Sequence, residues 1–235
     1  NVYRGTAYTG SYTTTAVNSE TFTVTGVATG TDAGTYTSAL AVSGAALSNY
    51  NTPVISNANF VISKADLTLS GSQVYNGGTA VAGSNLTANG VAGQTFTITG
   101  SGDATNLTSA NIQTASLLNS VTGLTLGTSS NGGISTNYNA ISTSGSSVTI
   151  GKADLGIVLS GTYSGTSVIV PTSYTITGLV GPVIETVISI TSATISDANV
   201  ATANKYVTAI VSGGGTANLN NYNITQAYNA TPSTT

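Results

Sequence analysis

The 235-residue sequence contains no cysteine, histidine, methionine or tryptophan, and charged residues make up only 5% of it. Without cysteine there is no disulfide framework, and without cysteine and histidine the usual ligands of zinc, copper and haem are missing. A nucleophilic serine would have no histidine as its base, and the acidic residues are too scattered to pair for glycoside chemistry. The sequence therefore predicts neither an enzyme nor a bound cofactor.

Positive charge and long apolar runs are also scarce. Four basic residues against seven acidic ones give a net charge of −3, and no basic patch is present to bind a nucleic-acid backbone. No run approaches about 18 apolar residues, so we expect no membrane span. Threonine and serine are abundant, at close to a third of the chain. Because β-branched threonine suits a half-exposed pleated surface, this composition predicts β-structure with a hydroxyl-rich exterior.

Four short markers recur along the chain in the same order, which indicates internal repeats. The clearest marker is the tripeptide Asn-Tyr-Asn, and we expect each copy to form a corner next to a strand. Asparagine bonds locally and tolerates left-handed backbone angles, and a buried tyrosine hydroxyl usually bonds to backbone. The corner residues are Asn49, Tyr50, Asn51, Asn137, Tyr138, Asn139, Asn221, Tyr222 and Asn223.

The second marker is Lys-Ala-Asp followed by leucine, which marks the joint between one repeat and the next. Its residues are Lys64, Ala65, Asp66, Lys152, Ala153 and Asp154. The third marker is Tyr-x-Gly, at residues 3–5, 75–77 and 163–165. The fourth is a threonine-rich strand at residues 20–26 and 94–100. Residues 185–190 align with this strand in the third repeat, and residues 174–178 are a rival match.

These markers divide the sequence into three repeats, at residues 1–63, 64–151 and 152–235. Short alternating strands separated by Gly and Asn turns predict an all-β fold. We expect a tandem array of three small β-sandwich-like domains joined by short, stiff strand-to-strand linkers. The first repeat lacks the leading Lys-Ala-Asp-Leu strand. The third lacks the closing strand, since Pro232 stands where that strand would run.

The alternation of apolar residues changes its parity at each joint. Phe60 and Ile62 stand at even positions before the first joint, and Leu67 and Leu69 stand at odd positions after it. The same change separates Ile150 from Leu155. Because neighbouring side chains point to opposite faces of a strand, the chain should leave one core and enter the next on its other face. We therefore expect a rod, with a length of roughly 100 Å for three repeats.

Two groups of charged residues have simple structural interpretations. Lys64 and Asp66, like Lys152 and Asp154, could pair across the joint and keep its edge hydrated. The second group consists of three aspartates that each precede alanine in a turn; the expectation is an Asx-turn, and a calcium site is the alternative. These aspartates are Asp32, Asp103 and Asp197.

The markers together resemble the MBG (mostly-β, glycine-rich) and YDG repeats of large bacterial exoproteins. Residues 1–63 resemble an MBG unit, and the two longer repeats resemble the YDG type, with Tyr-Asn-Gly and Tyr-Ser-Gly in place of Tyr-Asp-Gly. The resemblance implies a filamentous-haemagglutinin-like adhesin or biofilm matrix protein, secreted through two-partner secretion and displayed outside the cell. Its repeats would act as a stalk, with neighbouring repeats, identical subunits or a host or cell surface as partners.

Two other functions fit the same sequence. The incomplete ends are compatible with a fibre or pilus-like subunit that polymerises by β-strand complementation between neighbours. Tyrosine supplies 12 of the 15 aromatic residues, and exposed tyrosines can stack on sugars, so a polysaccharide-binding module is the second alternative.

Overall fold

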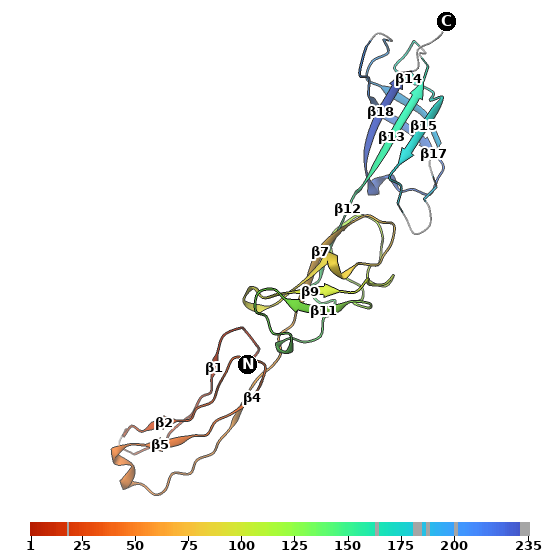
Figure 1. The fold of residues 1–235 in the computed structure, drawn as a ribbon. Helices are drawn as coiled ribbons and strands as arrows, with labels where there is room; N and C mark the ends of the chain where they lie inside the picture. Colours follow the sequence, from red (N-terminus) through yellow and green to blue (C-terminus); the bar gives the residue numbers. More distant parts are fainter. Residues whose placement is uncertain (18, 163–164, 181–184, 187–188, 200–201, 231–235) are drawn as a thin grey trace. The chain divides into compact units, whose positions relative to one another are not determined.

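The computed structural model describes residues 1–235 apart from 18, 163–164, 181–184, 187–188, 200–201 and 231–235 (Figure 1). The fold is all-β, as predicted, with 41% of residues in strands. Helical structure amounts to 8%, and the described residues include no helix of seven or more residues. No helix in the described part of the chain is long and apolar enough to cross a membrane.

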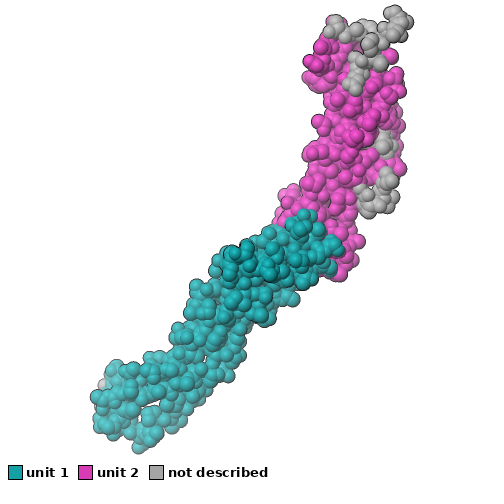
Figure 2. Space-filling view, in the orientation of Figure 1, with its two compact units in different colours: residues 1–70, 82–101, 123–146 teal, residues 71–81, 102–122, 147–235 magenta. Residues whose placement is uncertain are grey.

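The chain folds as two compact units (Figure 2). Unit 1 comprises residues 1–70, 82–101 and 123–146, and unit 2 comprises residues 71–81, 102–122 and 147–235. Residues of the middle repeat therefore contribute to both units. The three repeats remain a division of the sequence, and each unit is described separately below.

The first repeat, in unit 1, contains three two-stranded antiparallel sheets and one short 3-10 helix. The sheets pair β1 (Tyr8–Thr9) with β3 (Thr29–Gly30), β2 (Thr23–Thr25) with β5 (Ala41–Ser43), and β4 (Gly34–Thr37) with β6 (Asn59–Ile62). The helix is η1 (Ala45–Asn49). Few side chains of this repeat are buried; Tyr3 and Ile62 are the large ones, at 4% and 1% exposure.

The middle repeat forms a sheet in the order β10-β12-β7-β8-β9-β11. Strand β7 (Thr68–Val74) begins in unit 1 and ends in unit 2. The unit 1 strands are β8 (Leu86–Asn89), β9 (Thr95–Thr99) and β11 (Thr125–Ser129). The unit 2 strands are β10 (Gln113–Ser116) and β12 (Ser147–Gly151). Three 3-10 turns connect them: η2 (Gly83–Asn85), η3 (Val91–Gly93) and η4 (Ser135–Asn137).

The described residues of the third repeat, in unit 2, form two three-stranded sheets. The first has the order β15-β13-β18, and the second has the order β14-β16-β17. Their bounds are β13 (Ala153–Gly161), β14 (Val168–Ile169), β15 (Ser173–Thr177), β16 (Ser189–Ile195), β17 (Val207–Gly213) and β18 (Tyr222–Ala230), with η5 (Leu219–Asn221) before β18.

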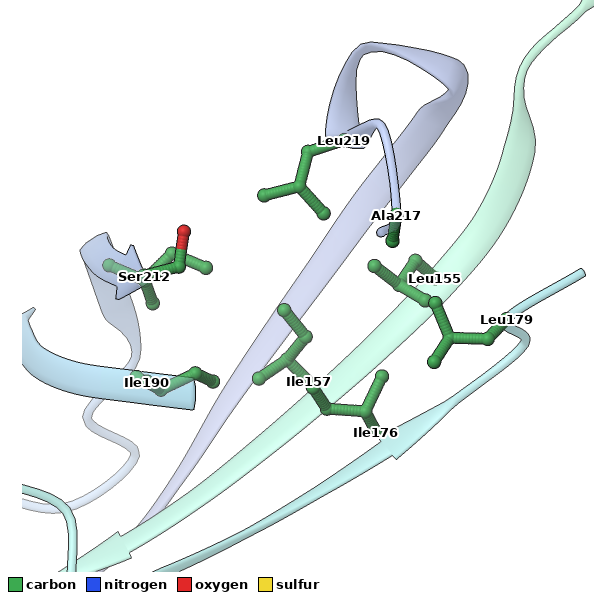
Figure 3. Close-up of a pocket in the computed structure, with 9 residues that line it drawn as sticks. Leu155, Ile157, Ile176, Leu179, Ile190, Ser212, Ala217 and Leu219 are labelled. Atoms are coloured by element: carbon green, nitrogen blue, oxygen red, sulfur yellow. The ribbon is translucent and has the colours of Figure 1, made fainter. Parts of the chain in front are cut away.

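Apolar side chains from both sheets of the third repeat face one another (Figure 3). Ile157 and Ile176 come from the first sheet, and Ile190 and Ile210 from the second. The cavity among them is only about 10 Å³. This is barely enough for one water molecule, so the space between the sheets is a packed core and not a ligand pocket.

The change of parity seen in the sequence appears in the burial of the side chains. At the first joint the buried positions shift from Ile62 to Ala65, Leu67 and Leu69. At the second joint they shift from Ile150 to Ala153 and to the odd positions that follow. A single residue, Lys152, separates the end of β12 from the start of β13.

The third repeat ends differently from the second. The position around Pro232, where the closing strand was expected to be missing, lies outside the described residues. The segment before it, β18, runs parallel to β13 with nine consecutive residue pairs, from Ala153↔Tyr222 to Gly161↔Ala230. In the middle repeat the neighbour of β7 on this side is β12, which comes nine residues after Tyr138.

Candidate functional site: two inter-repeat joints

Two tyrosines from different repeats meet in unit 1. Tyr3 belongs to the Tyr-x-Gly marker of the first repeat, and Tyr138 to the Asn-Tyr-Asn marker of the second. Their rings are T-shaped with a centroid distance of 5.4 Å, and Phe96 also packs against Tyr138, with a centroid distance of 5.2 Å. Edge-to-face contact is a favoured geometry for aromatic rings. All three side chains are almost fully buried.

One glutamine joins the two hydroxyls of this aromatic pair. The Gln94 amide nitrogen donates to the Tyr3 hydroxyl at 2.9 Å, and the Tyr138 hydroxyl donates to the Gln94 oxygen at 2.7 Å. The Tyr138 hydroxyl also accepts the backbone N–H of Val91 at 3.0 Å. Both buried hydroxyls are therefore satisfied, which is what burial of polar groups requires.

A second contact of the first joint uses the asparagine before Tyr138. The Asn137 side-chain oxygen accepts the backbone N–H of Ala33 at 2.8 Å, and its nitrogen donates to the Asp32 carboxylate at 2.7 Å. Asn137 is 1% exposed and ends the η4 turn. It therefore acts as a two-point clamp on the Asp32-Ala33 turn of the preceding repeat.

Unit 2 contains the same arrangement between the second and third repeats. Tyr75 and Tyr222 are T-shaped with a centroid distance of 5.5 Å. Glu185 stands where the first joint has Gln94, and it accepts from both hydroxyls: from Tyr75 at 2.5 Å, and from Tyr222 through its other oxygen. The Tyr222 hydroxyl accepts the N–H of Val180 at 3.1 Å, as Tyr138 accepts that of Val91.

The clamp is also repeated in unit 2. The Asn221 side-chain oxygen accepts the N–H of Ile112 at 3.0 Å, and its nitrogen donates to the side-chain oxygen of Asn111 at 2.8 Å. Asn111 takes the place of Asp32 as the acceptor. The fully buried Asn221 ends the η5 turn, which corresponds to η4.

The environment of each joint changes the acidity of its tyrosines. Burial, and then the hydrogen bond to Glu185, raises the pKa of Tyr222 to about 12. The same two causes, in the same order, raise the pKa of Tyr75. At the first joint burial raises the pKa of Tyr138. All these shifts favour the neutral hydroxyl, which is the form that donates a hydrogen bond.

The Lys-Ala-Asp and Asn-Tyr-Asn markers of one repeat lie side by side. Ala65 forms a parallel bridge with Tyr138, and Ala153 pairs in parallel with Tyr222. The third residue of each Asn-Tyr-Asn then donates to the aspartate of the partner marker. The bonds join Asn139 to Asp66 at 2.7 Å and Asn223 to Asp154 at 3.3 Å.

These contacts correct two expectations. Neither Lys64 nor Lys152, both described and exposed, forms an ion pair with the nearby aspartate, because asparagine amides bind Asp66 and Asp154 instead. The asparagines of the corners do not use left-handed angles either, since none of them has a positive φ. They sit in or next to 3-10 turns. In the second and third repeats their side chains make the contacts.

The first repeat carries the same constellation without its aromatic partner. The Tyr50 hydroxyl donates to Glu20 and accepts the N–H of Val17 at 3.2 Å, and its ring is T-shaped against Phe22 at 5.3 Å. No tyrosine of the described residues packs on Tyr50 as Tyr3 packs on Tyr138. The side chain of Asn49 is exposed and makes no hydrogen bond with the described residues.

The three turn aspartates fall into two groups. Asp103 accepts the N–H of Thr105 at 2.7 Å, and Asp197 accepts that of Asn199 at 2.8 Å, which are Asx-turns. Hydrogen bonds from Thr105 and Thr202 lower the pKa of Asp103 and Asp197 respectively. Asp32 instead serves the first joint. Among the described residues no three acidic, histidine or cysteine side chains gather as metal ligands would.

Sequence reasoning did not single out Gln94, Glu185, Asp32 or Asn111 as joint residues. Gln94 and Glu185 align with Glu20 at the start of the threonine-rich marker. A hydrogen-bonding side chain that recurs at this position is the sequence feature that could have indicated a joint residue. The contacts of Glu185 also support its alignment with Gln94 over the rival match at residues 174–178, which forms β15. Comparison with known protein families, with curated proteins and with solved structures finds no match for this chain.

Proposed function

We propose that this chain is a structural repeat region, of the stalk or matrix-forming kind, from an extracellular bacterial adhesin. The observation that carries the proposal is that the same joint is built twice. An aromatic pair, a side chain shared by two hydroxyls and an asparagine clamp recur at both places. Such a repeated joint suits a protein that must hold consecutive repeats in register.

The joint resists bending for physical reasons. Its tyrosines are buried and satisfied, so rotating one repeat against the next would break several hydrogen bonds and expose two rings. The asparagine clamp adds two directional bonds away from the rings. The single-residue crossing at Lys152 contains no glycine-rich or proline-containing linker. These features support a joint that holds the orientation of one repeat relative to the next.

The remaining part of the proposal rests on composition and resemblance. The weakly charged, hydroxyl-rich composition suits contact with other surfaces and with neighbouring chains, and the markers resemble those of secreted bacterial adhesins. The absence of cysteine removes disulfide formation as an obstacle to secretion in an unfolded form. The tight packing of the third repeat and the scattered acids add no support for an enzymatic site.

The test is to separate the joints from the repeats. In a double variant, Asn137→Ala and Asn221→Ala, both clamps are lost and the repeats keep their own strands. A matched variant, Asn139→Ala and Asn223→Ala, removes hydrogen bonds within single repeats. Electron micrographs of the clamp variant should show a wider distribution of end-to-end distances than the wild type, and the matched variant should not.

Adhesion is measured with the same two variants displayed on a non-adherent bacterium. Cells that carry the wild-type chain should aggregate or stay attached under flow, and the clamp variant should reduce this. If cells with the wild-type chain attach no better than cells without it, the adhesin proposal is wrong. If both double variants give the wild-type distance distribution, the joints are not what holds the repeats in register.

A further inference from the structure

A long groove runs through the first repeat. One hollow of about 330 Å³ is lined by residues of the segments 11–14 and 54–58, together with Val24, Leu40 and Val42. A second hollow of about 230 Å³ continues past Thr15, Phe22 and Tyr50. Large apolar side chains in this region are exposed, including Val54 at 98%, Tyr12 at 48% and Ile55 at 43%.

In the other two repeats a strand occupies the corresponding place. Strand β7 lies between β8 and β12, and β13 lies between β15 and β18. Strand β7 begins after the first Lys-Ala-Asp marker, and β13 begins inside the second. Both strands bury alternate leucine or isoleucine side chains, such as Leu69 and Leu159 at 0% exposure. The first repeat has no such strand in the described structure between segments 11–15 and 51–58.

One end of this strand position makes the same contact in the first repeat as in the second, and the other end carries the same residue type. In the second repeat, Tyr138 bridges Ala65 at the start of the strand, and Gly151 accepts the N–H of Tyr75 just after its end. In the first repeat, Ser63 accepts the N–H of Tyr3, and Tyr50 stands where Tyr138 does. Thirteen positions separate Tyr50 from Ser63, and thirteen separate Tyr138 from Gly151.

Burial of the surrounding side chains differs as an absent strand would require. Phe96 and Ile98 of β9 are 2% and 3% exposed, whereas the aligned Phe22 and Val24 of the first repeat are only half-buried. Apolar residues left uncovered in this way favour addition of a further strand.

The last two residues of such a strand are already in place. Val2 forms a parallel bridge with Ser63, and the backbone of Asn1 accepts the N–H of Ser63 at 2.7 Å. At the other end, Asn51 is exposed, lines the second hollow and makes no hydrogen bond with the described residues. Its counterparts Asn139 and Asn223 each bind the aspartate of a Lys-Ala-Asp marker.

We propose that the groove of the first repeat binds an extended β-strand of the Lys-Ala-Asp-Leu type, supplied by the same polypeptide and running directly into Asn1. The strand lies parallel to the segment that follows Tyr50, its alanine pairs with Tyr50, and its aspartate accepts a hydrogen bond from Asn51. Lys64 precedes Tyr75 by eleven residues, and Lys152 precedes Tyr163 by the same distance. This spacing places the lysine nine residues before Asn1. The proposal does not depend on the adhesive role.

The direct test fuses the nine residues Lys64–Ser72 of this chain immediately before Asn1. Hydrogen–deuterium exchange should slow by roughly tenfold or more at the amides of residues 13–15 and 51–58, because these become paired or covered. The matched control carries the same nine residues with both leucines moved one position along. It has the same composition but directs its apolar side chains away from the groove, so it should give little protection.

Two further experiments test the contact made by Asn51 and whether the strand comes from the same polypeptide. Asn51→Ala should reduce the protection in the fused protein and leave the unfused chain unchanged. A separate peptide with the sequence of residues 64–74 should protect the unfused chain only at high concentration, because it lacks the effective concentration of a linked strand. Equal protection by the shifted control overturns the proposal. Protection by dilute separate peptide without protection by the fusion assigns the groove to another chain and overturns the proposed source.

Discussion

Asn139 donates a hydrogen bond of 2.7 Å to Asp66, a residue 73 positions earlier in the chain. The same bond joins Asn223 to Asp154 in the next repeat. The two most recognisable markers of the sequence are therefore contact partners, held together by a parallel pairing of their central residues. The asparagine before each tyrosine faces the other way, toward the preceding repeat. Each Asn-Tyr-Asn of the second and third repeats thus makes one asparagine bond within its own repeat and others to the preceding repeat.

The clamp asparagine should matter more to stability than the asparagine two residues later. Asn137→Ala removes two hydrogen bonds and leaves the Ala33 N–H and the Asp32 carboxylate without this partner. We expect a loss of about 1–3 kcal/mol in the free energy of unfolding of unit 1, measured by urea denaturation. Asn139→Ala removes one exposed bond and should cost about 0.5 kcal/mol. Equal effects of the two variants would contradict the clamp.

The second joint should weaken in alkaline solution. The neutral Tyr222 hydroxyl is stabilised in the folded state, where its pKa is about 12 against an ordinary value of 10.0. Stability from this group is therefore complete below pH 10 and is lost as the pH rises toward 12, because the unfolded chain releases its proton first. Thermal unfolding measured across this pH range should show the loss.

Glu185→Gln separates the two causes of that shift. Burial remains and the carboxylate is removed, so the Tyr222 pKa should fall below 12 and stay above its ordinary value. Ultraviolet absorbance of tyrosinate follows the titration. Glu20→Gln is the control, because it changes the neighbour of Tyr50 and leaves the second joint untouched. A Tyr222 titration that is the same in Glu185→Gln and in the wild type would rule out a contribution from the carboxylate.

Gly90 is required for a steric reason. A Cβ atom at this position would lie 2.4 Å from the Tyr138 hydroxyl oxygen and 2.6 Å from the ring carbon that bears it. Its φ of −108° is an ordinary value, so backbone strain does not enter. Gly90→Ala should displace the ring and destabilise unit 1 by about 1–3 kcal/mol. Gly34→Ala, whose Cβ would meet nothing closer than 3.8 Å, should have little effect in the same denaturation experiment.

Neighbouring residues of β13 should respond very differently to truncation. Leu159 is 0% exposed and Val158 is 37% exposed. Leu159→Ala should destabilise unit 2 by about 2–5 kcal/mol, because it opens a cavity in a packed core. Val158→Ala should change the free energy of unfolding by about 0.5 kcal/mol or less. Comparable losses for both variants would show that the alternation of β13 is wrongly assigned.

Alternation made the all-β class and the parity change predictable from sequence. The buried sides of β6, β7, β12 and β13 follow from which positions carry Leu, Ile and Val, since the period of a strand is two. The parallel pairing of Ala65 with Tyr138 could not be predicted in this way. Local propensity does not determine which distant segments pair. The one related signal in the sequence is that the aspartate of Lys-Ala-Asp and the asparagine of Asn-Tyr-Asn recur together.

The joint residues were harder to predict for a different reason. Gln94 and Glu185 occupy one structural position with different chemistry, and so do Asp32 and Asn111. Each pair conserves the capacity to accept a hydrogen bond and not the residue type, so a search for recurring letters passes over them. The expected Lys–Asp ion pairs were wrong for the converse reason. The recurring residues Lys and Asp suggested that they pair, but each aspartate is bound by an asparagine side chain.

The pairing of β13 with β18 determines how the third repeat would respond to a pulling force. The chain enters this repeat at the start of β13, and β18 runs in the same direction toward the far end of the pair. Tension between Lys152 and Ala230 would therefore act along both strands and load all nine residue pairs in shear at the same time. A hairpin pulled from its open end would instead release its bonds one after another. The parallel register of β13 and β18 would therefore make this repeat resist a load applied along its strands.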